Sequence, residues 1–151
     1  MSEPVSFEEY LRDNDTLTYT NVGTSMLPLL REGRDLFIVR RKGSERCKKG
    51  DVVLYWHPPD RYVLHRIIDV TEEGYILMGD NTVSKEYGIK DSDIIGVMTG
   101  YVRNGICHST GEYSYRLYSF LIMNTVRLRV FCKKMVIRLK GHIKRLKHEN
   151  K

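Results

Sequence analysis

Short apolar runs separated by polar turns fill most of the chain. Apolar and β-branched residues dominate six segments, at residues 17–22, 36–39, 52–56, 62–70, 75–78 and 93–102. Glycine, proline and charged residues separate these segments. Short strands with such turns at nearly regular spacing are typical of antiparallel sheets and barrels. The pattern predicts a mainly β domain over residues 1–112, as a sheet or a partly open barrel.

Two segments depart from this pattern, one at each end of the chain. Ser6 begins an S-x-x-E capping box, which predicts a short helix that residues 13–15 interrupt. From Tyr113 the apolar residues recur every three or four positions, and lysine and arginine fill much of the space between them. This period predicts a basic amphipathic helix over residues 113–151, with a break near Gly141.

The charge is divided unequally between these two parts. The formal net charge of the chain is +6. Residues 113–151 hold 11 lysines and arginines against one acid, whereas residues 1–112 hold 14 basic and 18 acidic residues. The basic character therefore belongs to the predicted helix. Three interpretations of this helix remain open: it binds an anionic membrane surface, it packs on the β domain, or it binds nucleic acid or a protein partner.

Cysteine usage and the N-terminal sequence narrow the class of protein. Cys47, Cys107 and Cys132 are odd in number and widely spaced, which argues against a disulfide framework and for a reducing compartment. We find no cluster with metal-ligand spacing and expect neither a metal nor another cofactor. The first 20 residues are polar and acidic, unlike a signal peptide. No run of about 18 apolar residues predicts a membrane span.

Residues 23–28, with the sequence Gly-Thr-Ser-Met-Leu-Pro, are the first candidate for chemistry. Gly23 permits backbone angles that a side chain disfavours, and Pro28 restricts its own φ and the residue before it. Ser25 is therefore expected on a constrained bend that can aim its hydroxyl. A serine nucleophile needs this geometry and a nearby base. Taken alone, the turn fits equally a serine that only forms a turn.

Three further segments follow this turn in order. His65 precedes Arg66 within an apolar run, a Gly-Asp-Asn turn occupies residues 79–81, and residues 93–98 read Asp-Ile-Ile-Gly-Val-Met. The Ser25 turn and these three segments form four sequence motifs in order. With these motifs, the chain from about residue 22 to residue 101 resembles the signal peptidase I and LexA-type family of serine proteases. The resemblance implies the signal-peptidase/LexA-like complex β fold, followed here by the basic helix.

The resemblance also implies roles for individual residues. Ser25 matches the nucleophile, and His65 occupies the general-base position, where common bacterial members have lysine. A histidine there is similar to the endoplasmic-reticulum and archaeal signal peptidases. Asp80 is the predicted third member, which would orient the imidazole, although an aspartate in this turn also fits a purely local role. Asp93 is a fallback for the orienting carboxylate, and it fits equally a residue that begins a strand.

Two positions depart from the family pattern. The Ser25 N–H is the natural first donor of an oxyanion hole. Many signal peptidases have a hydroxyl residue two positions before the nucleophile, where this chain has Gly23, so we expect the second donor from Thr24 or another amide of the turn around Met26. Family members often carry another aspartate in the loop after the Gly-Asp-Asn turn, and Glu86 is the candidate substitute here.

Two functions fit these residues. The first is a serine endopeptidase of the signal-peptidase type that processes a leader or precursor peptide through Ser25 and His65. The alternative is a catalytically inactive binding or regulatory module on the same fold, which the departures at Gly23 and Glu86 motivate. A LexA-type repressor fits less well, because only about 15 residues precede the first predicted strand, too few for a DNA-binding helix pair.

The resemblance bears on partners and location as well. Signal peptidases work beside membranes, which favours an anionic membrane surface as the partner of residues 113–151 and disfavours nucleic acid. A peptide or protein precursor is the expected substrate. The cysteines and the absence of an export signal predict a cytoplasmic enzyme, peripheral at the inner membrane face.

Overall fold

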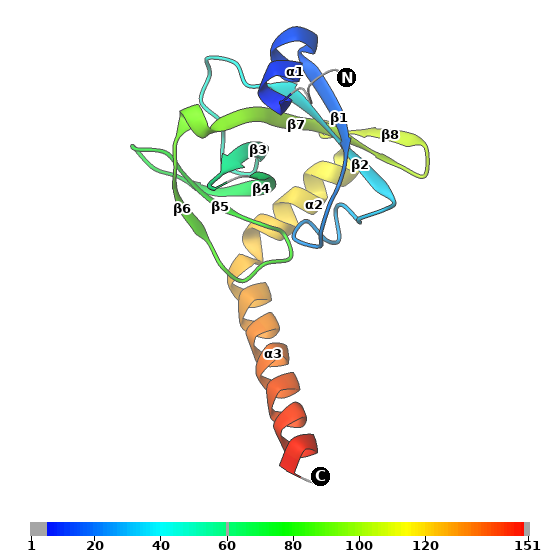
Figure 1. Ribbon diagram of the computed structural model, residues 1–151, viewed down its shortest axis with the longest axis vertical. Helices are drawn as coiled ribbons and strands as arrows, with labels where there is room; N and C mark the ends of the chain where they lie inside the picture. The colour runs from blue at the N-terminus through cyan, green and yellow to red at the C-terminus, as the bar shows by residue number, and fades with distance from the viewer. Residues whose placement is uncertain (1–5, 60, 150–151) are drawn as a thin grey trace.

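The computed structural model describes residues 6–59 and 61–149, and their architecture is mainly β (Figure 1). Eight strands of the described chain form one antiparallel sheet: β1 (Thr16–Thr20), β2 (Asp35–Arg41), β3 (Val52–His57), β4 (Arg61–Val70), β5 (Tyr75–Met78), β6 (Glu86–Ile89), β7 (Ile94–Arg103) and β8 (Ile106–Ser109). The spatial order is β1-β2-β7-β3-β4-β5-β6, and β8 pairs with β7. The predicted mainly β class is therefore confirmed.

Alternating side chains of the central strands build one apolar cluster on each face of the sheet. Leu54 on β3 and Leu64 on β4 belong to the first cluster, which also contains residues of β1, β2 and β7. Tyr55 on β3 and Ile67 on β4 belong to the second, with Leu77 on β5. Side chains of a strand point alternately to the two faces. His65 and Arg66, which are neighbours in β4, therefore lie on different faces.

The N-terminal helix begins where the capping box predicts. The Ser6 hydroxyl accepts the N–H of Glu9 at 3.2 Å, and helix α1 follows over Phe7–Asn14. Leu11 is buried, and the Phe7 ring lies 4.8 Å from that of Tyr62 on β4. The helix therefore covers one end of the sheet and runs through part of the segment predicted to interrupt it.

Strands β6 and β8 were not predicted from the pattern of apolar residues. Both are short and mostly exposed, so no alternation of buried residues marks them. The sequence nevertheless holds a local signal for β8, the pair Asn104-Gly105. In the structure these residues adopt positive φ values of 52° and 77° between β7 and β8. An Asn-Gly pair of this kind is the commonest two-residue hairpin turn.

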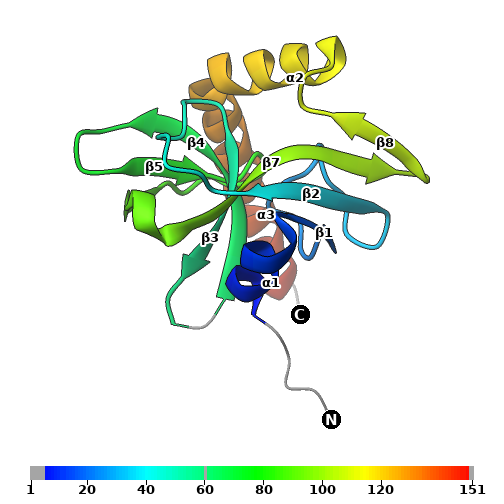
Figure 2. The same ribbon diagram turned by 90° about the horizontal axis from the view of Figure 1, so that it is seen from above.

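The C-terminal helical segment divides at Thr125 and not at Gly141. Helix α2 spans Tyr113–Asn124 and α3 spans Val126–Glu149, so α3 runs through Gly141. Tyr115 of α2 belongs to the first apolar cluster, whereas α3 projects from the body (Figures 1 and 2). The predicted contribution of Leu146 to the apolar side of the helix lies outside the described side chains. None of the helices in the described ranges is both long and apolar enough to cross a membrane.

Candidate active site

The turn after β1 presents Ser25 on a bend that other parts of the chain hold in place. Gly23 has a φ of +81°, in the region that favours glycine. The Asn81 N–H donates to the Ser25 carbonyl at 2.7 Å, and the Asn81 side-chain amide donates to the Thr24 carbonyl at 3.0 Å. Met26 is buried in the first apolar cluster. Ser25 itself remains partly exposed, so the turn is fixed on both sides while its serine stays accessible.

His65 lies in the middle of β4, where it pairs in register with Val53 of β3. Its side chain is 8% exposed. The strand fixes the position of its Cβ, and the polar groups around the ring nitrogens orient the imidazole. Its two ring nitrogens then meet different surroundings, Nε2 toward the Ser25 turn and Nδ1 toward β3 and β6.

Gly79 shows how closely Ser25 and His65 approach one another. A Cβ added at Gly79 would lie 2.7 Å from the Ser25 carbonyl oxygen and 3.1 Å from Nε2 of His65. Both atoms are therefore close to one point, and a side chain at position 79 would collide with the Ser25 backbone. The Gly-Asp-Asn turn thus contributes a glycine that lets the Ser25 backbone and the imidazole approach the same point, although among the described residues no hydrogen bond joins the Ser25 hydroxyl to His65.

On the other side of the imidazole lies Glu86. Its Oε1 is 3.2 Å from Nδ1 of His65, and the Tyr55 hydroxyl is 3.3 Å from the same nitrogen. The Tyr55 hydroxyl also donates to the second oxygen of Glu86. Burial favours the protonated carboxyl, but the bonds from His65 and Tyr55 outweigh it and lower the pKa of Glu86. Burial and Glu86 together raise the pKa of Tyr55, which keeps the phenol as a donor.

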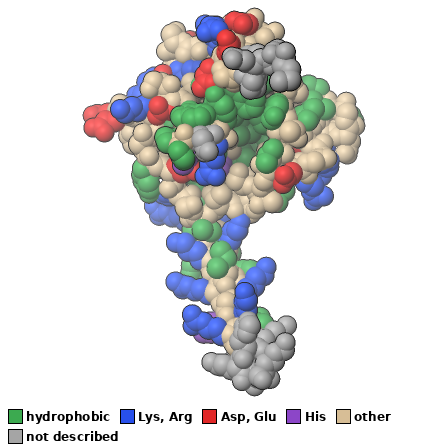
Figure 3. All heavy atoms as spheres, in the orientation of Figure 1, with side chains coloured by type: hydrophobic (Ala, Val, Ile, Leu, Met, Phe, Trp, Pro, Cys, Tyr) green, Lys and Arg blue, Asp and Glu red, His purple; other side chains and the backbone are tan. Residues whose placement is uncertain are grey.

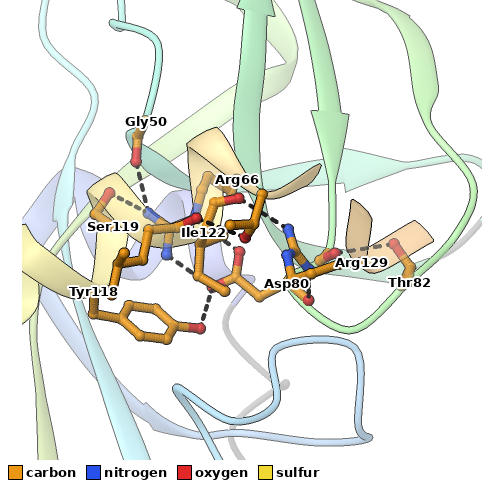
Figure 4. Close-up of polar contacts among 11 residues, drawn as sticks. Gly50, Arg66, Asp80, Thr82, Tyr118, Ser119, Ile122 and Arg129 are labelled. Carbon is orange, nitrogen blue, oxygen red and sulfur yellow. Dashed lines mark hydrogen bonds and ion pairs between the residues drawn. The ribbon is translucent and has the colours of Figure 1, made fainter. Parts of the chain in front are cut away.

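Asp80 does not orient His65, which corrects the prediction from the sequence. Its carboxylate binds the guanidinium of Arg66 with both oxygens, at 2.8 Å each (Figure 4). The Tyr118 hydroxyl of α2 donates to the same carboxylate at 2.9 Å. Within the described residues no ion pair joins Asp80 to His65. The reason is strand alternation, because His65 and Arg66 point to opposite faces of β4 and both Asp80 oxygens bind on the Arg66 side.

The Arg66–Asp80 pair also ties the C-terminal segment to the sheet. Arg66 donates to the Gly50 carbonyl and to the Ser119 hydroxyl of α2, both at 2.9 Å (Figure 4). Arg129 of α3 donates to the Asp80 carbonyl. Burial disfavours the charged guanidinium, yet Asp80 more than compensates and raises the pKa of Arg66. The pair therefore acts as a structural junction between β4, the Gly-Asp-Asn turn and both helices.

Asp93, the fallback carboxylate, has a local structural role instead. It ends the short 3-10 turn η1 (Asp91–Asp93), and its Oδ2 accepts the Lys90 N–H at 2.8 Å. The side chain thus closes the turn that leads into β7. Its polar capacity is used by the backbone before it, which is the local role that a residue at the start of a strand commonly takes.

The sequence did not predict the contact between α3 and the Gly-Asp-Asn turn. The Lys133 ammonium of α3 donates to the carbonyl and to the side-chain oxygen of Asn81, the latter at 2.6 Å. Asn81 in turn holds the carbonyls of Thr24 and Ser25. Burial and the nearby Arg129 lower the pKa of Lys133. No sequence pattern marks this lysine among its many basic neighbours.

An apolar hollow lies next to the Ser25 turn. Its volume is about 100 Å³, and its walls come from α1 and strands β1 to β4, through Phe7, Tyr19, Thr20, Asn21, Val22, Phe37, Leu54, Tyr62 and Leu64. Figure 3 shows apolar side chains gathered over the middle of this face of the body. Val22 is 71% exposed and immediately precedes Gly23. The hollow therefore extends to the residue that leads into the Ser25 turn.

Metal ligands and known relatives were sought as well. Over residues 6–59 and 61–149, no group of three or more His, Cys, Asp or Glu side chains is arranged to hold a metal ion. A scan against protein-family models gave no match, and a search of curated proteins gave none either. Functional inference therefore rests on the geometry of the residues themselves.

Proposed function

We propose that this chain is a serine endopeptidase of the signal-peptidase type, with Ser25 as nucleophile, His65 as general base and Glu86 as the carboxylate that orients the base. The proposal rests above all on the groups that lie near the two ring nitrogens of His65. Nε2 of His65 faces the Ser25 turn across Gly79, while Nδ1 faces Glu86 at 3.2 Å. A nucleophile, a base and a group that orients the base, in this sequence, form the arrangement that activates a serine.

The mechanism follows from these positions. Nε2 of neutral His65 takes the Ser25 hydroxyl proton as the oxygen attacks a peptide carbonyl. Glu86 accepts a hydrogen bond from Nδ1–H, which fixes the tautomer and stabilises the imidazolium that forms. The imidazolium then gives its proton to the leaving amine, and a water attacks the acyl-enzyme with the same base.

The negative oxygen of the tetrahedral intermediate needs preorganised donors. The Ser25 N–H is the first candidate, because no described residue accepts a hydrogen bond from it. Gly23 has no hydroxyl, so we assign the second donor to the turn itself, through Thr24 or a neighbouring amide. The bonds from the Asn81 backbone and side chain hold the turn in one geometry, which is what a preorganised donor pair requires.

The expected substrate is a precursor peptide in an extended conformation. The apolar hollow beside Val22 suits one apolar side chain near the cleaved bond. The sequence-based alternative, an inactive binding module on the same fold, uses the same hollow without turnover. The two functions differ only in whether Ser25 reacts.

The experiment is digestion of a peptide library, with the cleaved bonds identified by mass spectrometry. We expect cleavage next to apolar residues by the wild type and a loss of about 10⁶-fold in Ser25→Ala. Covalent labelling by a serine-directed acylating agent, mapped to residue 25, supplies a second readout that needs no substrate. Equal cleavage by Ser25→Ala, or an unlabelled Ser25 in a folded protein without turnover, would overturn the proposal and favour the binding module.

A further inference from the structure

A stripe of apolar side chains runs along the C-terminal helices and is exposed throughout. At about 100° per residue its members share one face within each helix. They are Tyr113, Leu117, Phe120 and Leu121 in α2, and Leu128, Phe131, Met135, Leu139 and Ile143 in α3. Leu128, Phe131 and Leu139 are 63%, 62% and 58% exposed. We call this set the apolar stripe. So many large apolar side chains along one face exceed the scattered exposure of an ordinary surface.

The body of the protein does not cover the apolar stripe. Helix α2 packs on the sheet through other residues, of which Tyr115 and Ile122 are buried. Helix α3 contacts the body through Arg129 and Lys133, whose charged ends reach the Gly-Asp-Asn turn. The interpretation that the stripe packs on the β domain therefore fails, because polar contacts hold the base of α3 while the apolar side chains stay exposed.

Positive charge borders the apolar stripe. At 100° per residue, Arg127, Lys134 and Arg138 follow one edge of the stripe, and Lys140 and Lys144 follow the other. Figure 3 shows lysine and arginine side chains along both sides of the projecting helix. No acidic residue occurs from Tyr113 to residue 148. The surface thus combines an apolar centre with cationic borders.

We propose that α2 and α3 dock along the surface of an anionic lipid bilayer, with the apolar stripe in the acyl boundary and the flanking cations among the headgroups. A membrane surface satisfies both parts of the pattern, since apolar area and anionic lipid each add to binding. A nucleic acid would match the cations but leave the stripe in water. A second copy of the chain would cover the stripe but bring two strongly cationic segments together.

This inference goes beyond the proposed enzyme and does not depend on it. The contact from Lys133 to Asn81 links the two regions, because Asn81 also binds the Ser25 turn. A helix that lies on a bilayer therefore keeps the candidate site close to the membrane surface. Binding is measured without any substrate, so a failure of docking and a failure of catalysis are distinguishable.

The test is co-sedimentation of the full chain with vesicles of phosphatidylcholine containing about one third phosphatidylglycerol. Leu139→Gln, in the stripe, is compared with Ile137→Gln, which is 53% exposed on the opposite side of the same helix. We expect Leu139→Gln to weaken binding about tenfold and Ile137→Gln to change it by less than about twofold. Both sites are exposed, so neither substitution should disturb folding, and unchanged thermal unfolding serves as the control.

Two further experiments test separately the contribution of the flanking cations and the insertion of the apolar stripe into the bilayer. Reversal of Lys134 and Arg138 to glutamate should weaken binding to anionic vesicles by about tenfold or more and have little effect on neutral ones. In a Trp56→Phe background, Phe131→Trp should show blue-shifted fluorescence with vesicles, whereas Ile137→Trp should not. Equal effects of the Leu139 and Ile137 variants would overturn the proposal. Dimerisation that buries the apolar stripe would also overturn it, as would binding to RNA or DNA but not to vesicles.

Discussion

His65 and Arg66 are neighbours on β4, yet each belongs to a cluster of a different kind. His65 has a carboxylate partner, Glu86, whose side chain is 25% exposed, and it faces a partly exposed serine turn. Arg66 has Asp80, and the two side chains are 0% and 1% exposed. The first cluster keeps partial contact with solvent, whereas α2 covers the second.

The two carboxylates, Asp80 and Glu86, differ in their burial and in the groups that they bind. Asp80 has each of its oxygens occupied by Arg66, and Tyr118 adds a third bond. This carboxylate is directed to the Arg66 side of β4, away from the imidazole. Glu86 binds His65 and Tyr55 at the rim of the sheet. We therefore expect variants of the first cluster to lose activity and variants of the second to lose stability.

The largest expected effect is on catalysis in Glu86→Gln. Glutamine keeps the shape but removes the charge that stabilises the imidazolium, so kcat should fall by about 10⁴-fold with little change in KM. Cleavage of a peptide found in the library digestion measures it, and the melting temperature serves as the control. If Asp80→Asn lost this activity per folded molecule while Glu86→Gln kept it, the assignment of the two carboxylates would be reversed.

The next largest effect is on stability in Asp80→Asn. This change leaves the buried Arg66 charge without its counter-ion and should lower the free energy of unfolding by about 3–5 kcal/mol. Urea denaturation followed by circular dichroism measures the loss. Glu86→Gln is the matched comparison, because its partly exposed site should lose much less. Equal losses in the two variants would erase the distinction between the clusters.

Gly79→Ala tests whether the close approach of the Ser25 turn and His65 at Gly79 is needed for cleavage. The added methyl would meet the Ser25 carbonyl at 2.7 Å and Nε2 of His65 at 3.1 Å, so the two residues must move apart. A displacement of this size should reduce kcat by about 10²-fold. Gly141→Ala on α3, where an added Cβ meets nothing within 4 Å, is the control. Unchanged cleavage by Gly79→Ala would show that Ser25 and His65 do not need this approach.

Acidification is the smallest disturbance, and it tests Asp35 of β2, a buried carboxylate that belongs to neither cluster. Arg34 and further bonds lower the pKa of the buried Asp35 from 3.8 to about 2. Its stabilising contribution is present above pH 3.8 and is lost as the pH falls through about 2. The circular dichroism signal should therefore hold above pH 3.8 and weaken as the pH falls toward about 2, and a signal lost entirely above pH 3.8 would contradict this.

Local patterns were enough to predict the strands that have a buried face. Alternation of apolar residues placed β4 within one residue of its observed start, and the capping box placed the start of α1. Strands β6 and β8 lack such a face, so composition did not reveal them. The break in the C-terminal helix was predicted at Gly141 but occurs at Thr125, where α2 ends its packing on the sheet and α3 leaves it. The position of a helix end there depends on tertiary contacts more than on glycine propensity.

The sequence by itself determined the chemical types: a serine on a glycine-containing turn, a histidine on a strand, carboxylates in the loops that follow, and a basic helix with an apolar period. Only the tertiary structure decided that Glu86 and not Asp80 lies beside His65, and that the apolar stripe of the helix is uncovered. Both outcomes depend on which face of a sheet or helix meets which neighbour. Residue order fixes the alternation along one element, but the pairing of elements far apart in the chain decides what each face contacts.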